Sequence, residues 1–201
     1  MPGRDYLLLS ATEPDRSGLV AELTGFIAEC GGNVEDSRVV VLGGHAGLML
    51  LVSGPADRLA AVVSGLEGLQ QRTGIRAVPR RVAPRRDAGS HDTGRVEISA
   101  SAIDHEGIIH ALAETVRRHG GNILELESAT EPAPMSGEPL LTLRMTVWAG
   151  EAGAGERLRQ ELEQVAEREG VDLGVRLVPP SKASAAVGSE RRTVPRPPSD
   201  S

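Results

Sequence analysis

ECGGNV at residues 29–34 returns 89 positions later as RHGGNI at residues 118–123. A glycine at the end of a helical pattern stops the helix at little steric cost, because it adopts the left-handed C′ conformation. One glycine is enough for that purpose, whereas both stretches carry two glycines followed by an asparagine and a branched apolar residue. The recurrence therefore indicates two copies of one structural unit.

The residues before the two glycine pairs align at the same offset without a gap. Six of the nineteen positions from 15 to 33 are identical to those from 104 to 122, namely Asp15/Asp104, Gly18/Gly107, Leu23/Leu112, Gly31/Gly120, Gly32/Gly121 and Asn33/Asn122. A chance match would not hold one register over this span, so an internal repeat is predicted.

Both copies show the same order of predicted elements. Short apolar or alternating runs predict strands, and apolar residues three and four apart predict helices. Along each copy these are a first strand (6–10 and 96–100), a helix ending at the glycine pair, a hairpin (34–53 and 123–148), a second helix (56–71 and 156–168) and a final strand (75–78 and 171–178). The predicted fold class is α+β: two ferredoxin-like βαββαβ domains, each a four-stranded antiparallel sheet with two helices on one face.

The apolar pattern also predicts which side chains face the core. In the second helix of the first copy, the buried face is predicted to carry Leu59, Val62, Val63, Leu66 and Leu69. In the last hairpin strand of the second copy, alternate residues are predicted to point inward, namely Leu141, Leu143, Met145 and Val147.

Composition divides the chain into four parts. The first domain is predicted at 5–82 and the second at 95–178, with a linker at 83–94 and a disordered tail at 179–201. The linker region is rich in Pro, Gly and Arg and has no periodicity, so a solvated segment is expected, with contact to an acidic partner as the alternative. The tail is Pro- and Ser-rich and lacks an apolar pattern.

The overall composition is globular, with 39% hydrophobic and 25% charged residues. The only aromatic residues are Tyr6, Phe26 and Trp148, so the cores must be aliphatic and a base-stacking platform for single-stranded nucleic acid is not expected. A formal net charge of -6 gives the chain no attraction to DNA or to an anionic membrane.

Neither a signal peptide nor a membrane span is expected. The N-terminus runs directly into a strand without a signal-peptide core, and the longest apolar stretch, 39–52, is interrupted and too short to cross a bilayer. The single cysteine, Cys30, cannot form an intrachain disulfide. We therefore expect a cytoplasmic protein with no membrane partner.

The chain carries no recognisable catalytic motif. A nucleophile elbow, a P-loop, a dinucleotide-binding fingerprint and a Cys–His pair are all missing, so no catalytic residue and no cofactor are predicted. His105, His110 and His119 do not share one helical face, and no metal site is predicted. The duplication leaves no room for a helix-turn-helix, so direct binding to nucleic acid is not expected.

The loops EPDRSGLV at 13–20 and AIDHEGII at 102–109 are the first candidate binding elements. A helix N-terminus presents unpaired N–H groups that can hold a carboxylate, and Gly18 and Gly107 would let a ligand approach the backbone. Asp15 and Asp104 could accept hydrogen bonds from an ammonium group, so a free amino acid would fit. The alternative is that each aspartate only caps its helix.

Asn33 and Asn122 are the second candidates. Asparagine after two glycines is also an ordinary turn residue, and that interpretation stays open. The start of the second strand lies at the opposite side of the sheet from the loop after the first strand. Each asparagine could therefore reach a loop only in another unit, which would place a ligand at an interface.

The stretch DRSGLVAELTGFIAECGGNVEDSRVV, residues 15–40, resembles the ACT domain, a small regulatory module that binds amino acids. The resemblance rests on D-x-x-G-[LI] followed by G-G-N-[VI], and it covers roughly 5–82 and 94–178. Two such units with little else resemble the family of the glycine cleavage system transcriptional repressor.

The resemblance implies two pseudo-equivalent sites between ACT units. Carried over residue by residue, the implied ligand-binding residues are Asp15, Arg16, Ser17, Gly18, Leu19, Asn33 and Val34 in the first copy and Asp104, Gly107, Ile108, Asn122 and Ile123 in the second. It also implies a non-enzymatic regulator that binds a small amino acid, with glycine as the candidate. We expect a homodimer that acts on a DNA-binding regulator as its protein partner.

Two other functions stay open. An interaction and dimerisation scaffold without ligand would carry the same fold. ACT tandems also occur fused to catalytic domains, although no such domain fits in this chain.

The two loops depart from the family pattern in different ways. The position before the loop glycine is often proline, and here it is Ser17 in the first copy and Glu106 in the second. A carboxylate at Glu106 would repel a ligand carboxylate at the helix start. Our hypothesis is that the loop around Asp15 binds ligand and the loop around Asp104 is weakened or purely structural.

Overall fold

The computed structural model describes residues 5–83, 94–150 and 153–179. The chain splits into two compact units, Met1–Arg85 and Arg86–Ser201. The predicted linker and tail lie almost wholly outside the described residues, so the domain boundaries at these segments stay predictions. Each unit is described by itself below.

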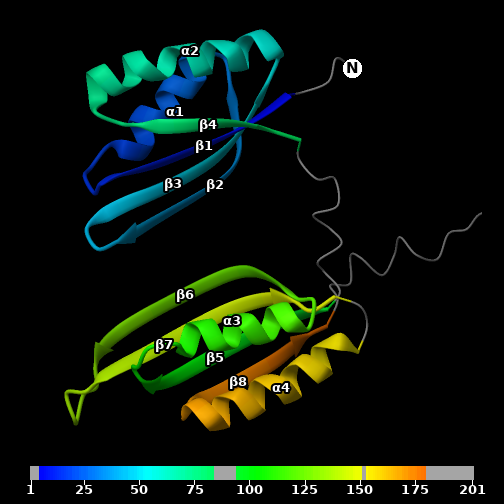
Figure 1. The fold of residues 1–201 in the computed structure, drawn as a ribbon. Helices are drawn as coiled ribbons and strands as arrows, with labels where there is room; N and C mark the ends of the chain where they lie inside the picture. The colour runs from blue at the N-terminus through cyan, green and yellow to red at the C-terminus, as the bar shows by residue number, and fades with distance from the viewer. Residues whose placement is uncertain (1–4, 84–93, 151–152, 180–201) are drawn as a thin grey trace, which may run out of the picture. The chain divides into compact units, whose positions relative to one another are not determined.

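The first unit is a four-stranded antiparallel sheet with two helices on one of its faces (Figure 1). The sheet order is β2-β3-β1-β4. Its elements are β1 (Asp5–Pro14), α1 (Leu19–Glu29), β2 (Asn33–Leu42), β3 (His45–Gly54), α2 (Ala56–Thr73) and β4 (Ala77–Val82).

The second unit repeats this topology with the sheet order β6-β7-β5-β8. Its elements are β5 (Arg95–Ile103), α3 (Ile108–Arg118), β6 (Asn122–Pro132), β7 (Pro139–Trp148), α4 (Ala154–Glu169) and β8 (Asp172–Val178). The predicted α+β class, with two ferredoxin-like βαββαβ domains, is confirmed.

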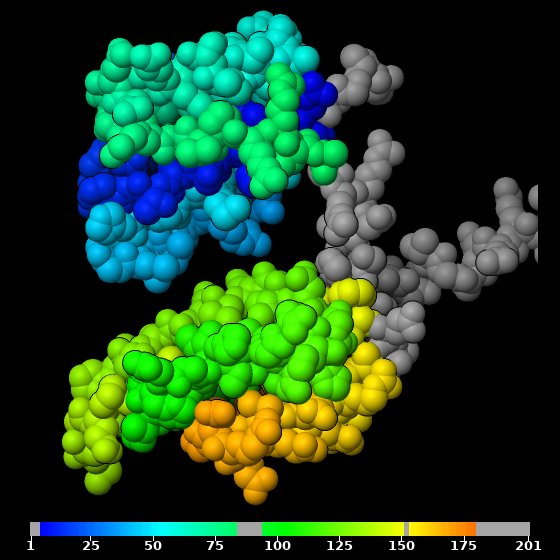
Figure 2. All heavy atoms as spheres, in the orientation of Figure 1, coloured from blue at the N-terminus to red at the C-terminus, as the bar shows by residue number. Residues whose placement is uncertain are grey.

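Each unit has its own hydrophobic core, which is aliphatic apart from Phe26 in the first unit. In the space-filling view, the atoms of each unit form a closely packed body (Figure 2). In β1, Leu7 and Leu9 are fully buried, and they pack with Leu23 and Ile27 of α1. Full burial of each such side chain contributes about 1.5–3 kcal/mol relative to exposure. The predicted inward face of β7 is confirmed, because all four of its residues are buried: Leu141, Leu143, Met145 and Val147.

Two local predictions are wrong. Val63 is 39% exposed, because the helix face that meets the sheet is narrower than its apolar stripe. Ile75 was predicted to begin the last strand of the first unit, but β4 begins at Ala77. Ile75 instead follows Gly74, the left-handed residue that ends α2. Its side chain is buried in the core and 1% exposed.

The two hairpins also match each other structurally, although the sequence identities of the repeat do not include them. Gly43 and Gly44 both have positive φ, 55° and 77°, which matches the two-residue turn that joins twisted antiparallel strands. The first strand of each hairpin carries an irregularity at the same place, between Val34 and Asp36 in β2 and between Ile123 and Glu125 in β6. The two sheets therefore share even their β-bulges.

Candidate functional site

The loops after β1 and β5 reach their helices through a left-handed glycine. Gly18 has φ 93° and Gly107 has φ 99°, and each occupies the N-cap position of its helix. Among the described residues no side chain caps either helix start. The interpretation of Asp15 and Asp104 as N-caps is therefore wrong, because α1 and α3 begin at the fourth residue after each aspartate.

The backbone of each loop is fixed to the end of the neighbouring hairpin. The amide of Asp15 donates to Gly44 O at 2.9 Å, and the amide of Asp104 donates to Pro139 O at 2.8 Å. Each aspartate is therefore held beside the edge strand of its sheet, with its helix start close by.

The two aspartate side chains differ in their surroundings. Asp104 Oδ2 accepts a hydrogen bond from Thr130 Oγ1 of β6 at 3.1 Å. Asp15 is exposed, and within the described ranges its carboxylate has no hydrogen-bond or ion-pair partner. The first unit thus presents an open carboxylate where the second unit presents an occupied one.

A cavity of about 280 Å³ adjoins the open carboxylate. Asp15, Arg16 and Gly18 lie on its loop side, and the rest of its lining is apolar, from the first turn of α1 and from β2 and β3: Leu19, Val20, Ala21, Val39, Val41, Ala46 and Leu48. Val39 and Val41 are about half exposed, at 49% and 53%. The cavity thus pairs uncapped helix-start amides and a carboxylate with an apolar wall.

Arg16 does not face this cavity as a free cation. It binds Glu22 of α1 in two-point fashion, Nη1 to Oε1 at 2.9 Å and Nη2 to Oε2 at 2.6 Å. The hydrogen bond from Arg16 holds the pKa of Glu22 below its usual value, and the same bond raises the pKa of Arg16. Arg16 therefore stiffens the loop more than it offers charge to a ligand.

Two other predicted loop residues offer mainly their backbone. Leu19 and Ile108 are 4% and 1% exposed, so their side chains belong to the cores. Their amides lie at the uncapped helix starts. Ser17 is exposed, and its side chain is available beside the loop glycine.

Asn33 lies at the other end of the first sheet. It pairs with Ser53 of β3, and its Nδ2 donates to Glu35 Oε1 at 3.1 Å, which also accepts from Ser53 Oγ at 2.5 Å. Val34 beside it is half-buried against Val52. Sequence reasoning did not single out Glu35, which is the residue displaced by the β-bulge.

In the second unit Asn122 pairs with Trp148 and is exposed, and Ile123 is half-buried opposite Val147. The bulge position holds Leu124, so the polar triad of the first unit has no counterpart here. The two asparagine sites therefore differ, as the two aspartate sites do.

Within the first unit, loop and asparagine do not meet. Pro14, next to Asp15, pairs with His45 at the start of β3, whereas Asn33 pairs with Ser53 near its end. At about 3.4 Å per residue these partners are roughly 27 Å apart. The structure thus brings Asp15, Gly18 and the helix-start amides together and leaves Asn33 and Val34 at a separate place.

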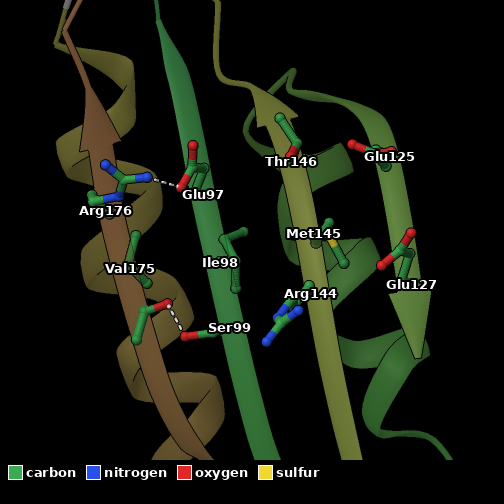
Figure 3. A pocket seen from close by; sticks show the side chains of 11 residues that line it. Glu97, Ile98, Ser99, Glu125, Glu127, Arg144, Met145, Thr146, Val175 and Arg176 are labelled. Carbon is green, nitrogen blue, oxygen red and sulfur yellow. Dashed lines mark hydrogen bonds and ion pairs between the residues drawn. The ribbon is translucent and has the colours of Figure 1, made fainter. Parts of the chain in front are cut away.

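A second hollow, of about 560 Å³, lies on the face of the second sheet that carries Glu97, Ser99 and Arg144 (Figure 3). Arg176 of β8 is paired with Glu97 of β5, and Glu125 and Glu127 project from β6. This sheet face contains neither predicted loop nor Asn122. We place the candidate site at the smaller cavity, because an open carboxylate and uncapped amides converge there and, among the described residues, not at the larger hollow.

Thr130, Val39 and Val41 lie at the two candidate loops, and the motif did not single them out. The alignment of the two copies at an offset of 89 does show this difference, since Val39 aligns with Ser128 and Val41 with Thr130. An apolar wall in one copy thus corresponds to a polar wall in the other.

Within the described residues, no group of three or more His, Cys, Asp or Glu side chains could hold a metal ion. No helix of the described ranges is long and apolar enough to cross a membrane.

Comparison with known proteins agrees with the fold. Residues 5–78 match the ACT domain family. The glycine cleavage system transcriptional repressors of Escherichia coli strain K12 and Shigella flexneri are each 27% identical to the chain over 146 residues, which cover 73% of this chain and 76% of theirs.

Two solved structures share the fold over both units. The crystal structure of an unknown protein from Galdieria sulphuraria is 30% identical, with a TM-score of 0.75, covering 88% of this chain and 99% of that one. A structure named for the glycine cleavage system transcriptional repressor is 18% identical, with a TM-score of 0.67 over 88% and 98% of the two chains. Residues 5–78 are thus an ACT domain, the second unit repeats its topology, and the chain as a whole resembles the glycine cleavage system transcriptional repressors.

Proposed function

We propose that the protein is a non-enzymatic regulator that binds a small amino acid at an interface between ACT units. The observation that carries the proposal is the cavity beside Asp15. There, a carboxylate without a partner among the described residues, uncapped helix-start amides and an apolar wall lie together. These are the three features that an α-amino acid requires of a binding site.

Each group of the ligand has a counterpart in this cavity. The amides at the start of α1 would bind the ligand carboxylate, since they carry partial positive charge and no side chain caps them. Asp15 would accept from the ammonium group. Val39 and Val41 would contact the ligand side chain, which extends the candidate ligands from glycine to small aliphatic amino acids.

The interface is part of the proposal because one unit does not hold all the implied residues. Asn33 lies at the far end of the sheet from Asp15, so an asparagine could complete the cavity only from another unit. Under a two-fold axis each copy would supply its loop to one site and its asparagine to the other. A homodimer satisfies this requirement.

The second loop is proposed to bind more weakly. Asp104 already accepts a hydrogen bond from Thr130, and Glu106 places a carboxylate beside the loop glycine. A ligand there would have to break the internal bond and meet like charge.

The regulatory role follows from the named relatives, which are transcriptional repressors. The sequence offers no DNA-binding motif, so we propose that the chain acts through a partner protein that binds DNA. An interaction scaffold without ligand is the alternative function.

A thermal-shift screen separates these functions. Glycine, alanine, serine, valine and leucine are added in turn to the full chain, and a ligand at 100 times its Kd should stabilise the fold by about 2.7 kcal/mol. A raised Tm with one or a few amino acids supports sensing. An unchanged Tm with every amino acid contradicts amino-acid sensing and favours the interaction scaffold.

Isothermal calorimetry with the selected amino acid then tests the site. Asp15→Ala should weaken binding by about 10- to 100-fold, the loss of a hydrogen bond to a charged group. Asp104→Ala should change affinity by less than about 3-fold, a shift of roughly 0.6 kcal/mol. Asp57→Ala, another exposed aspartate of the first unit, is the control. Equal losses for Asp15→Ala and Asp104→Ala would refute the asymmetry.

A further inference from the structure

Arg16 and His105 occupy the same position in the repeat, 89 residues apart. Besides its contact with Glu22, Arg16 donates from Nη1 to Ser17 O at 3.2 Å and from Nη2 to Thr73 O at 2.9 Å. Thr73 is the last residue of α2. In the first unit, a permanent cation therefore ties the loop to the C-terminus of the second helix.

His105 makes the same two contacts in the second unit. Its Nδ1 lies 3.2 Å from Glu106 O, the carbonyl of the next residue, and its Nε2 lies 3.1 Å from Glu169 O. Glu169 is the last residue of α4. The acceptors correspond one to one with those of Arg16, although arginine and histidine differ in length and shape.

Both acceptors of His105 are carbonyl oxygens, which only accept hydrogen bonds. A neutral imidazole carries one N–H and could satisfy one of them, whereas the imidazolium donates from both nitrogens. The C-terminus of α4 also favours a cation through its partial negative charge. The full two-point contact of His105 is therefore a property of its protonated form.

The surrounding charges act in the same direction. The hydrogen bond to the Glu169 carbonyl raises the pKa of His105 most, followed by the bond to the Glu106 carbonyl. Desolvation lowers it by less than either bond, and the charges of Glu169 and Asp104 raise it further. The charged residues on the loop, at the end of α4 and at the start of β8 are Asp104, Glu106, Arg168, Glu169 and Asp172.

We propose that His105 is a positioning residue that clamps the second loop to α4 only while it is protonated, so that this loop, unlike its Arg16-clamped counterpart, changes with pH. Because the pKa of the folded state is raised, the stabilisation is complete below the ordinary histidine pKa of about 6.5 and is lost as the pH rises through the raised value. The effect on ligand binding rests on the function proposed above; the clamp itself does not.

The test is an NMR titration of the ligand-free full chain from pH 5.5 to 8.5. Imidazole nitrogen shifts give the pKa of each histidine, and amide shifts follow the loops at 104–107 and 15–18. We expect His105 to titrate above pH 6.5. The chemical shifts of the 104–107 amides should change with the same midpoint, while those of the 15–18 amides should not change with that midpoint. His110→Gln and His119→Gln serve as controls that should leave this titration in place.

His105→Arg gives the sharpest contrast, because it installs the permanent cation of the first unit. It should hold the 104–107 amides at their low-pH positions throughout, whereas His105→Ala should hold them at their high-pH positions. The proposal is overturned if His105 titrates at or below 6.5, or if the 104–107 amides still titrate in the His105→Arg protein. Since no ligand is present, these results are independent of whether the amino-acid site exists.

Discussion

Gly18 shows how one residue fixes the geometry of the candidate site. Its φ of 93° turns the chain from the loop into α1, and an L side chain there would be strained. A Cβ at this position would also lie 3.3 Å from Glu22 Oε1, an atom of the Arg16 ion pair. The turn that exposes the helix-start amides thus requires glycine.

Gly18→Ala should lower the free energy of unfolding by about 1–2 kcal/mol, the cost of a left-handed L residue. The matched control is Gly25→Ala in the middle of α1, where an added Cβ meets nothing within 4 Å. That change should raise stability by about 0.5–1 kcal/mol through helix propensity. Urea unfolding of both variants measures the difference, and a Gly18→Ala protein as stable as the parent would contradict the strain argument.

At the residue scale, sequence reasoning singled out the loops but could not show the surroundings of their aspartates. Asp15 and Gly18 stand out because the repeat retains them. The bond from Thr130 to Asp104 joins residues 26 positions apart across the end of a sheet, so local pattern could not reveal it. The clamp by His105 was hidden for the same reason, since Glu169 lies 64 positions away.

Among the elements, α1 and α2 contact each other at a glycine. A Cβ built on Gly65 of α2 would lie 2.9 Å from Cε2 of Phe26, the one aromatic residue in the first core. Phe26 is 7% exposed, so its ring has little room to move away. Gly65 therefore sets the distance between the two helices of the first unit.

Gly65→Ala should destabilise the protein by about 1 kcal/mol, because overpacking of about 1–3 kcal/mol exceeds the gain in helix propensity of about 1 kcal/mol. Gly68→Ala, one turn further along the same helix, is the control. Its Cβ would meet only the flexible end of Arg72, so it should stabilise by about 0.5–1 kcal/mol. Thermal unfolding of the two variants should show a lower Tm for Gly65→Ala and a higher Tm for Gly68→Ala than for the parent protein. Changes in Tm of the same sign in both variants would contradict the packing argument.

The elements themselves followed from periodicity, apart from their ends. β1 runs from Asp5 to Pro14, well beyond the predicted 6–10, because strand pairing with β3 continues past the apolar run. A hydrophobic pattern in the sequence indicates which residues are buried. The length of a strand instead depends on where its hydrogen-bond partners on the neighbouring strand end. Ile75 illustrates the reverse case, a buried residue that lies outside any strand.

At the scale of the whole molecule, two copies of one fold have kept their cores and diverged at their edges. The edge strand β2 exposes four consecutive apolar residues, 49–68% exposed: Val39, Val40, Val41 and Leu42. The corresponding residues of β6 are Ser128, Ala129, Thr130 and Glu131. An exposed apolar edge invites pairing with another chain, and a polar edge resists it.

This divergence indicates that the proposed homodimer forms through β2, so Val40→Lys should weaken it. A lysine on an edge strand opposes strand addition, and at this half-exposed position it leaves the core of the unit intact. Ala129→Lys places the same charge at the equivalent position of β6 and should leave association unchanged.

Sedimentation equilibrium over a range of protein concentrations measures both dissociation constants, with circular dichroism as the check that each variant is folded. A Val40→Lys protein that dimerises like the parent, or an equal loss with Ala129→Lys, would exclude β2 as the contact. If the amino-acid site requires two chains, Val40→Lys should also weaken ligand binding in proportion to the loss of dimer, although residue 40 does not line the cavity.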